Sequence, residues 1–545
     1  MSRNDPVETA AADVLPEGTS LRPEQREAIE AVLQADTIAV LATGSGKTFV
    51  YVVAGRLLGG LTVVVSPTIA LQADQVAALH EAGLRAETCN SSRTAARRRR
   101  VLEQAAAGEL DVVLLAPEQL ADDDVVAALA EARPVLFVVD EAHCVSAWGV
   151  DFRPDYLALG PVVEALGRPR VLALTATAPP ELRRLIARNL GMRDVRTVVG
   201  AADRPEIHLS AHVVRDEDAV AARVQELLDE DASGGSRLVY VATRRRAEEL
   251  AAQLAEAGVE AVAYHGAMKR AERDRVHVGF RAGTLRTVVA TSAFGLGVDQ
   301  PDVRLVVHAD PPDTLDEYWQ EAGRAGRDGE LASAVLLSRP DGYGLRRFFA
   351  ASAGASENDL RAVVDALGDA SEPLRPAAVA RAAGLSPARS RRALNVLVRT
   401  GAVRESGPGA RLRPGPGREQ RVAAAVDWVE RVRVRQETGV DLVRRYAETT
   451  DCRRRLVLEL LGESHPEPCG RCDSCDAGTS EPAVTRPYPI GTRVEHEEWG
   501  TGQAVQYEAD RVVVLFDRAG YRTLDLDTVR EHHLLDVVGT PSTGG

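Results

Sequence analysis

Short apolar runs recur along the first two thirds of the chain and alternate with stretches of helical periodicity. The runs occupy residues 37–41, 62–65, 135–139, 171–174, 238–241, 261–265, 287–290, 304–308 and 334–337. Runs of this length that stop at polar residues are typical of buried parallel strands, and the helical stretches supply the crossovers between them. The pattern predicts an α/β fold with two parallel-sheet domains.

Two adjacent carboxylates, Asp140 and Glu141, end the apolar run 135–139. The carboxyl ends of parallel strands form the edge where α/β sheets bind ligands. An aspartate in this place can hold Mg²⁺, and the carboxylate after it can orient or deprotonate an attacking water. The strand therefore predicts an acid pair for phosphate chemistry.

A glycine-rich turn follows the run 37–41 and leads into a helical pattern. It consists of Thr43, Gly44, Ser45, Gly46, Lys47 and Thr48. Glycines let backbone amides turn toward phosphate oxygens, the lysine can reach the β- and γ-phosphates, and Thr48 can offer its hydroxyl to Mg²⁺. The first position of the common phosphate-loop pattern is Leu41 instead of glycine, so a plain glycine-rich turn is the alternative. Lys47 argues against it, because the chain has only one other lysine, Lys269, among 66 basic residues.

The motifs together resemble the RecQ family of DNA helicases, within helicase superfamily 2. The resemblance rests on DEAHC followed by SAWGVDFRPDY, with ATGSGKT upstream, and extends over residues 21 to about 338 and a later cysteine cluster. It implies two RecA-like domains with ATP between them and a motor that moves 3′ to 5′ on single-stranded DNA.

The resemblance also implies roles for individual residues. Gln25, with Arg22 beside it, would read the adenine; Gln320 would contact the nucleotide; Arg327 would be the arginine finger, and Arg324 would contact the γ-phosphate or couple the domains. These two arginines follow a helical pattern and are expected on one helical face. The residues expected to couple ATP to DNA are Ser66, Asn90, His143, Trp148, Phe152 and Arg153.

Basic residues concentrate in the segment 375–421, which holds eleven arginines and two glutamates, a net charge of +9. Two short helical patterns, 377–383 and 388–400, precede a Gly/Pro-rich tongue at 406–417. This order favours a winged helix whose second helix binds duplex phosphates. An arginine-rich helical connector is the alternative.

Four cysteines follow with the spacing C-x16-C-x2-C-x2-C: Cys452, Cys469, Cys472 and Cys475. Four thiolates suit a closed tetrahedral Zn²⁺ site with a structural role, and an iron–sulfur cluster is the weaker alternative. The surrounding residues resemble the zinc module of RecQ helicases. In that family the zinc module usually precedes the winged helix, whereas here the order is reversed.

Alternating short strands at 493–496, 503–507, 512–516 and 521–525 end the chain, with glycine turns between them. They resemble the small SH3-like or Tudor-like barrel of some bacterial repair helicases. That resemblance implies a protein partner such as RNA polymerase or a repair factor.

Length and charge limit the remaining possibilities. The net charge of −14 argues weakly against a nucleic-acid partner, because a helicase track is a local groove. No apolar run is long enough to cross a membrane and no signal peptide precedes the first domain, so a cytoplasmic protein is expected. The predicted parts are a flexible tail (1–19), RecA-like domain 1 with the ATP loop (20–203), RecA-like domain 2 (204–350), a winged-helix-like domain (351–418), a helical zinc module (419–478), a linker (479–488), an SH3/Tudor-like barrel (489–537) and a tail (538–545).

The sequence therefore predicts an ATP-dependent DNA helicase with ATP, Mg²⁺ and Zn²⁺ as its bound groups and single-stranded and duplex DNA as its partners. A DNA-stimulated ATPase that recruits or remodels without unwinding is the alternative. An RNA helicase is a weaker third possibility.

Overall fold

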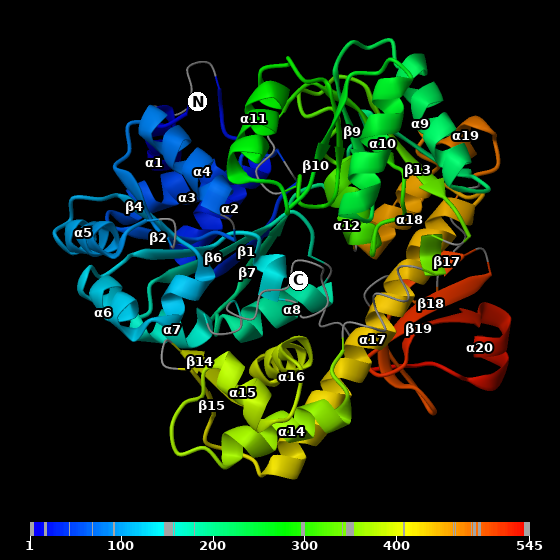
Figure 1. The fold of residues 1–545 in the computed structure, drawn as a ribbon. Helices are drawn as coiled ribbons and strands as arrows, with labels where there is room; N and C mark the ends of the chain where they lie inside the picture. The colour runs from blue at the N-terminus through cyan, green and yellow to red at the C-terminus, as the bar shows by residue number, and fades with distance from the viewer. Residues whose placement is uncertain are drawn as a thin grey trace. The chain divides into compact units, whose positions relative to one another are not determined.

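The computed structural model describes residues 5–15, 19–42, 44–67, 69–90, 93–145, 156, 159–178, 180–295, 300–340, 342–344, 354–406, 409–461, 463, 465–480, 482, 487–488, 492–508 and 510–538. The chain divides into two compact units. The first unit comprises Met1–Ala201 and Ala355–Val426, and the second comprises Ala202–Gly354 and Asp427–Gly545. Figure 1 labels the helices and strands of both units.

Seven parallel strands form the sheet of the first unit, in the order β3-β4-β2-β5-β6-β1-β7. Strand β6 lies between β5 and β1, so the acid pair after β5 and the glycine-rich turn after β1 share one edge of the sheet. Strands β1, β2, β4 and β5 are buried at every residue, which confirms the prediction from their apolar runs. The strands are β1 (Thr37–Val40), β2 (Thr62–Val65), β3 (Ala86–Cys89), β4 (Val112–Leu115), β5 (Leu136–Val139), β6 (Arg170–Thr175) and β7 (Arg196–Val199).

Helices cover both faces of this sheet, because successive strand residues point to opposite sides. Ile38 and Val40 face one set of helices, and Ala39 and Leu41 face the other. The first face carries α5 (Ala95–Ala106), α6 (Asp123–Glu131), α7 (Leu159–Ala165) and α8 (Pro180–Asn189). The second carries α1 (Pro6–Ala12), α2 (Pro23–Gln34), α3 (Lys47–Leu58) and α4 (Ile69–Glu81). Two 3-10 turns, η1 (Pro117–Ala121) and η2 (Ala142–Val145), complete the set.

Helix α1 corrects the prediction of a flexible tail over residues 1–19. Its residues Val7, Ala10 and Ala11 are buried in the core shared with α2 and α3. The Asp5 side chain caps the helix by accepting a hydrogen bond from the Val7 amide, and it pairs with Arg26 on α2. The apolar residues are few but recur at helical spacing, and tertiary packing stabilises the short helix.

The first unit ends in a three-helix segment with a hairpin, which confirms the predicted winged-helix-like part. Its elements are α14 (Glu357–Gly368), α15 (Pro376–Ala382), α16 (Pro387–Arg399), β14 (Val403–Ser406) and β15 (Gly409–Leu412). Strands β14 and β15 pair antiparallel, and Leu374 bridges to Ala410 beside them. Buried Val363, Val379 and Leu397 come from the three helices.

Six parallel strands form the sheet of the second unit, in the order β10-β11-β9-β12-β13-β8. They are β8 (Ile207–Val213), β9 (Ser236–Tyr240), β10 (Ala261–Tyr264), β11 (Thr287–Ala290), β12 (Val303–His308) and β13 (Ala332–Ser338). One face packs against α9 (Glu217–Glu230) and α10 (Arg244–Glu256). The other face packs against α11 (Arg270–Arg281) and α12 (Leu315–Ala322).

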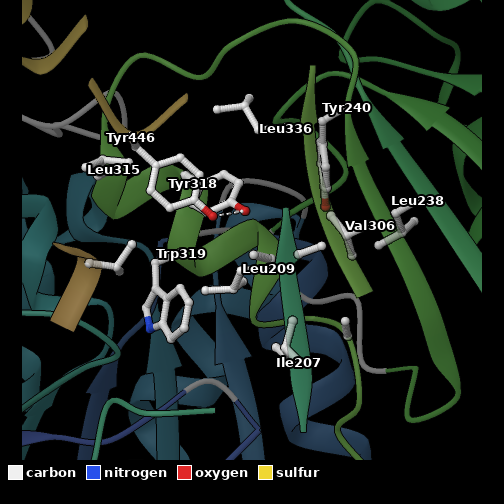
Figure 2. Close-up of a cluster of buried hydrophobic side chains, with 14 of the residues drawn as sticks. Ile207, Leu209, Leu238, Tyr240, Val306, Leu315, Tyr318, Trp319, Leu336 and Tyr446 are labelled. Carbon is white, nitrogen blue, oxygen red and sulfur yellow. Dashed lines mark hydrogen bonds between the residues drawn. The ribbon is translucent and has the colours of Figure 1, made fainter. Parts of the chain in front are cut away.

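The second face is completed by helices from the later part of the chain. These are the end of α17 (Arg418–Glu448) and α18 (Arg453–Leu460), with the short α19 (Asp473–Asp476) beyond them. Figure 2 shows Tyr446 of α17 beside Tyr318 of α12, with Trp319 and Leu209 nearby in the same apolar cluster. The zinc module and the second sheet therefore share one hydrophobic core.

A five-stranded antiparallel sheet ends the second unit, in the order β19-β18-β17-β16-β20. Its elements are β16 (Arg493–His496), β17 (Gly500–Glu508), β18 (Arg511–Phe516), β19 (Gly520–Asp525), α20 (Leu526–His532) and β20 (Asp536–Val537). Val494, Val514 and Phe516 lie in its own small core. The four predicted strands are confirmed, and β20 is added to them. In the described part of the chain, no helix is both long and apolar enough to span a lipid bilayer.

Candidate active site and zinc module

The glycine-rich turn after β1 opens helix α3 at Lys47. Gly44 and Gly46 have φ angles of 77° and 71°, a region that side chains other than glycine rarely adopt. A Cβ atom on Gly46 would also lie 2.8 Å from the Gln25 amide nitrogen. The buried Ser45 hydroxyl has no hydrogen-bond partner among the described residues. A helix N-terminus with an adjacent lysine and an unpartnered hydroxyl fits a bound phosphate group. Thr43 lies outside the described residues.

Gln25 of α2 is buried against this turn. Its side-chain amide donates to the carbonyls of Ser45, at 2.5 Å, and Gly46, at 3.2 Å. Its carbonyl oxygen accepts from the backbone amide of Arg22, whose side chain is exposed. Gln25 therefore holds helix α2 against the phosphate loop. The sequence predicts that Gln25 reads the adenine from this position.

Asp140 and Glu141 follow β5 at the same edge. The Gln75 amide donates to one carboxylate oxygen of Asp140, at 3.1 Å, and the Glu141 backbone amide donates to the other, at 3.0 Å. Burial, followed by the charge of Glu141, raises the pKa of Asp140 to about 6, although Lys47 and Gln75 oppose the change. Glu141 has a φ of 48°, the left-handed region, and such backbone strain is concentrated at functional sites.

Side chains suited to phosphate and metal chemistry meet at this edge of the sheet. The Lys47 ammonium lies 3.7 Å from a carboxylate oxygen of Glu141. Burial raises the pKa of the Tyr51 hydroxyl, and the charge of nearby Asp140 raises it further. Thr48 and Asp140, the two residues expected to hold Mg²⁺, offer a hydroxyl and a carboxylate whose oxygens suit a hard cation.

His143 connects the acid pair to the end of β6. Its Nδ1 atom lies 3.1 Å from the Thr175 hydroxyl and 3.3 Å from a Glu141 carboxylate oxygen. Thr175 in turn donates to the Thr177 carbonyl at 2.9 Å. Burial lowers the pKa of His143, but Cys144 and the Glu141 carboxylate outweigh it and hold the pKa well above the usual value. Three more of the residues expected to couple ATP to DNA, Trp148, Phe152 and Arg153, lie outside the described residues.

Ser66 and Asn90 are both buried and are joined by Gln72 of α4. The Gln72 amide donates to the Ser66 carbonyl at 2.9 Å, and the Asn90 amide donates to the Gln72 side-chain oxygen at 2.7 Å. The sequence interpretation missed Gln72 and Gln75. Two glutamines three residues apart, in the first turns of a helix that follows a strand end, are the signal that could have found them.

The second unit holds the arginines of the segment after α12. Gln320 lies on α12, but the helix ends at Ala322, and Arg324 and Arg327 lie in the turns after it. The expectation of two arginines on one helical face is therefore wrong. Gly326, with a φ of 63°, does not continue the helix. Arg324 is buried, whereas Arg327 is partly exposed.

The four cysteines of the second unit converge as the spacing predicts. All four sulfur atoms lie within 4.8 Å of one another, and the Cys469 and Cys475 sulfurs are 3.8 Å apart. Tetrahedral zinc with thiolate ligands spaces its sulfurs by about 3.8 Å. The backbone amides of Cys469 and Arg471 donate to the sulfurs of Cys452 and Cys469. The four thiols fit a structural Zn²⁺ site that leaves no position for water.

The zinc module is attached to the edge strand β8 of the second sheet. The Leu209 amide donates to the Arg471 carbonyl, at 3.2 Å, and the Ala211 amide donates to the Asp473 carboxylate, at 3.0 Å. These bonds satisfy backbone donors that an edge strand would otherwise expose.

Four protein families match successive parts of the chain. The DEAD/DEAH box helicase family matches residues 22–185, and the helicase conserved C-terminal domain matches 219–329. The IclR helix-turn-helix domain matches 361–407, and the RecQ zinc-binding family matches 425–476. These matches confirm that the helix-turn-helix part precedes the zinc module.

Similar proteins extend these matches. The ATP-dependent DNA helicase RecQ of Haemophilus influenzae is 35% identical over 59% of this chain and 52% of its own length. The RecQ helicase of Synechocystis is 33% identical over 84% of this chain and 95% of its own length. The helicase Lhr of Mycobacterium smegmatis, solved with single-stranded DNA and AMP-PNP, shares the fold with a TM-score of 0.50 and 23% identity, over 78% of this chain and 62% of that one.

The matched region covers about half the length of the Haemophilus influenzae and Pasteurella multocida relatives. The Synechocystis relative, by contrast, is covered almost completely, and the zinc-binding match is specific to one family. The chain belongs to the RecQ family of ATP-dependent DNA helicases.

Proposed function

We propose that this chain is an ATP-driven motor that moves 3′ to 5′ along single-stranded DNA and unwinds duplex DNA in repair or recombination. The observation that carries the proposal is the convergence of Lys47 and the Asp140–Glu141 pair at one sheet edge, directly beside the phosphate loop. A motor of this kind needs ATP and chromosomal DNA in the same compartment, so we expect the protein in the cytoplasm.

The first unit supplies the groups that hold and attack ATP. Gly44, Ser45 and Gly46 present backbone amides to the phosphates, and Lys47 neutralises their charge. Thr48 and Asp140 would hold Mg²⁺, which supplies charge stabilisation at the transferred phosphate. Glu141 orients the attacking water and accepts its proton, and His143 stabilises the Glu141 carboxylate from the other side.

The second unit supplies the cations that the transition state requires. In this proposal Arg327 is the arginine finger, Arg324 contacts the γ-phosphate, and Gln320 contacts the nucleotide. Closure of the two domains around ATP would complete the site and move the DNA strand past Trp148, Phe152 and Arg153.

An ATPase that recruits or remodels without unwinding is the second candidate, and one observation favours it. Two of the α16 arginines expected on duplex phosphates are engaged in ion pairs: Arg389 pairs with Asp359, and Arg391 pairs with Glu405. Duplex binding would have to exchange these pairs for phosphate contacts. The C-terminal five-stranded sheet suits a protein partner in either case, and RNA polymerase or a repair factor is our proposal.

ATP hydrolysis measured without nucleic acid, with single-stranded DNA and with single-stranded RNA of equal length tests the proposed function. We expect strong stimulation by DNA and little by RNA, and loss of hydrolysis in Lys47→Ala. A rate of ATP hydrolysis that DNA does not increase, or that only RNA increases, would refute a DNA motor.

A further inference from the structure

The guanidinium of Arg204 contacts the backbone on both sides of Arg324. One terminal nitrogen donates to the Gly323 carbonyl at 2.5 Å, and the other donates to the Ala325 carbonyl at 2.7 Å. Arg204 is buried, and more than a hundred residues separate it from this turn along the chain. A planar guanidinium can make two such bonds at once, whereas an ammonium cannot hold the same two directions.

The turn needs this support because it begins where α12 ends. The Gly323 and Ala325 carbonyls lie beyond the last helical residue, Ala322, in the protein interior, where an unpaired carbonyl is costly. Gly323, Arg324 and Ala325 are all buried. By satisfying two of these carbonyls, Arg204 fixes the backbone that carries the Arg324 side chain.

Arg204 is itself held from two sides. Its Nε atom donates to Glu206 at 2.5 Å, and its backbone carbonyl accepts from Arg454 of α18 at 2.6 Å. Arg454 also donates to the Asp203 carboxylate and to the Ile207 carbonyl, each at 2.5 Å. Burial opposes the charge of Arg454, but Asp203 raises its pKa, so the guanidinium stays charged. The segment before β8 thus connects the zinc module to the arginine turn.

We propose that Arg204 is a positioning residue for ATP hydrolysis: it fixes the backbone of residues 323–327 so that Arg324 and Arg327 meet the phosphates in one geometry. The inference rests on the proposed function, because it assigns these arginines to the γ-phosphate. It adds a residue outside the helicase motifs and a physical route from the zinc module to the catalytic arginines.

The test replaces Arg204 with lysine, which keeps the charge and loses the double contact. The matched control is Arg237→Lys on β9, where an arginine likewise donates to a carboxylate and a carbonyl, both of Asp231, and none of these bonds reaches residues 323–327. In Arg204→Lys we expect kcat for DNA-stimulated hydrolysis to fall about tenfold or more, with KM for ATP within about twofold of wild type. The control should keep wild-type kcat.

Hydrogen exchange of peptides covering residues 315–330 gives a second readout that needs no activity. We expect the amides of 323–327 to exchange about tenfold faster in Arg204→Lys than in wild type or in Arg237→Lys. Zinc content and the thermal midpoint report whether the second unit is folded. If Arg204→Lys does not fold, Glu206→Gln replaces it, because this variant weakens the hold on Arg204 without changing Arg204 itself.

A variant whose kcat and exchange both match those of wild type would overturn the inference, and so would an equal loss of kcat in Arg237→Lys. If the wild-type chain hydrolyses no ATP, the proposed function fails, and the exchange measurement alone decides whether Arg204 holds the turn.

Discussion

The Lys47 ammonium lies 3.7 Å from the Glu141 carboxylate, and both side chains are largely buried. Without nucleotide, the lysine therefore neutralises the carboxylate that we propose as the base. Binding of the phosphates must draw the lysine away from Glu141, which frees the carboxylate for water.

Glu141→Gln should separate binding from chemistry. The neutral amide no longer competes with phosphate for Lys47, so the affinity for a non-hydrolysable ATP analogue should equal or exceed that of wild type. Hydrolysis should fall by about 100-fold or more, because the general base is lost. Equilibrium titration and steady-state kinetics measure the two effects, and analogue binding that weakens tenfold would contradict this arrangement.

Asp140→Asn should stabilise the nucleotide-free protein while abolishing hydrolysis. Burial and Glu141 raise the pKa of Asp140 to about 6, above the value of an unfolded aspartate. A carboxyl group with a raised pKa contributes its stability at low pH and loses it as the pH rises through about 6. Near pH 7.5 the buried charge costs up to about 3 kcal/mol, which the amide removes.

Thermal unfolding of Asp140→Asn and wild type without nucleotide or Mg²⁺ measures this difference. The variant should have the higher midpoint near pH 7.5, and its advantage should shrink toward about pH 4. An advantage that grows as the pH falls would mean that the pKa of Asp140 is lowered.

Removal of zinc should unfold the module and weaken the second unit. Cys472 is fully buried and bridges to Leu209 of β8, so loss of the metal also releases that edge strand. We expect Cys472→Ser to lose the single bound zinc and several kcal/mol of unfolding free energy. The control is Cys89→Ser, since Cys89 is equally buried but lies in β3. Metal analysis measures the zinc content of both variants, and urea unfolding measures their free energy of unfolding. Retention of zinc by Cys472→Ser would disprove the four-cysteine site.

The hydroxyls of Tyr318 and Tyr446 share a buried hydrogen bond of 2.8 Å, with ring centroids 4.7 Å apart (Figure 2). This hydrogen bond joins α12 to α17. Gly439 of α17 also lets the two segments approach closely, because a Cβ atom there would lie 2.9 Å from the Asp313 carbonyl, just before α12. Each single change to phenylalanine should cost about 1–2 kcal/mol, because it leaves the other hydroxyl unpaired. The double variant should cost about 1 kcal/mol less than the sum. Additive losses in urea unfolding would show that the two hydroxyls are not coupled.

Much of the site could be predicted because its signals are local. The phosphate loop, the acid pair and the cysteines each occupy a short stretch whose residue types suit one chemistry. The contacts that organise these groups are not local: Gln25 reaches Ser45, Gln75 reaches Asp140, and Arg204 reaches the carbonyls beside Arg324. A single glutamine or arginine in a sequence does not reveal which backbone carbonyl it will meet.

Helix ends show the same limit. The arginine segment continues the helical pattern of α12, but the helix stops at Ala322, Arg204 binds the Gly323 and Ala325 carbonyls, and Gly326 has a left-handed backbone. For α1 the error is the opposite one, because the sequence predicts a flexible tail where the structure has a helix. Packing against α2 and α3 stabilises this short helix.

Strand separation of a 3′-tailed and a 5′-tailed DNA duplex with Mg-ATP, run beside Glu141→Gln, tests the proposed motor most directly. The proposal predicts unwinding of the 3′-tailed duplex alone and its loss in the variant. DNA-stimulated hydrolysis without unwinding of either duplex would contradict it and favour the recruiting ATPase, with the winged helix placed before the zinc module as the structural reason.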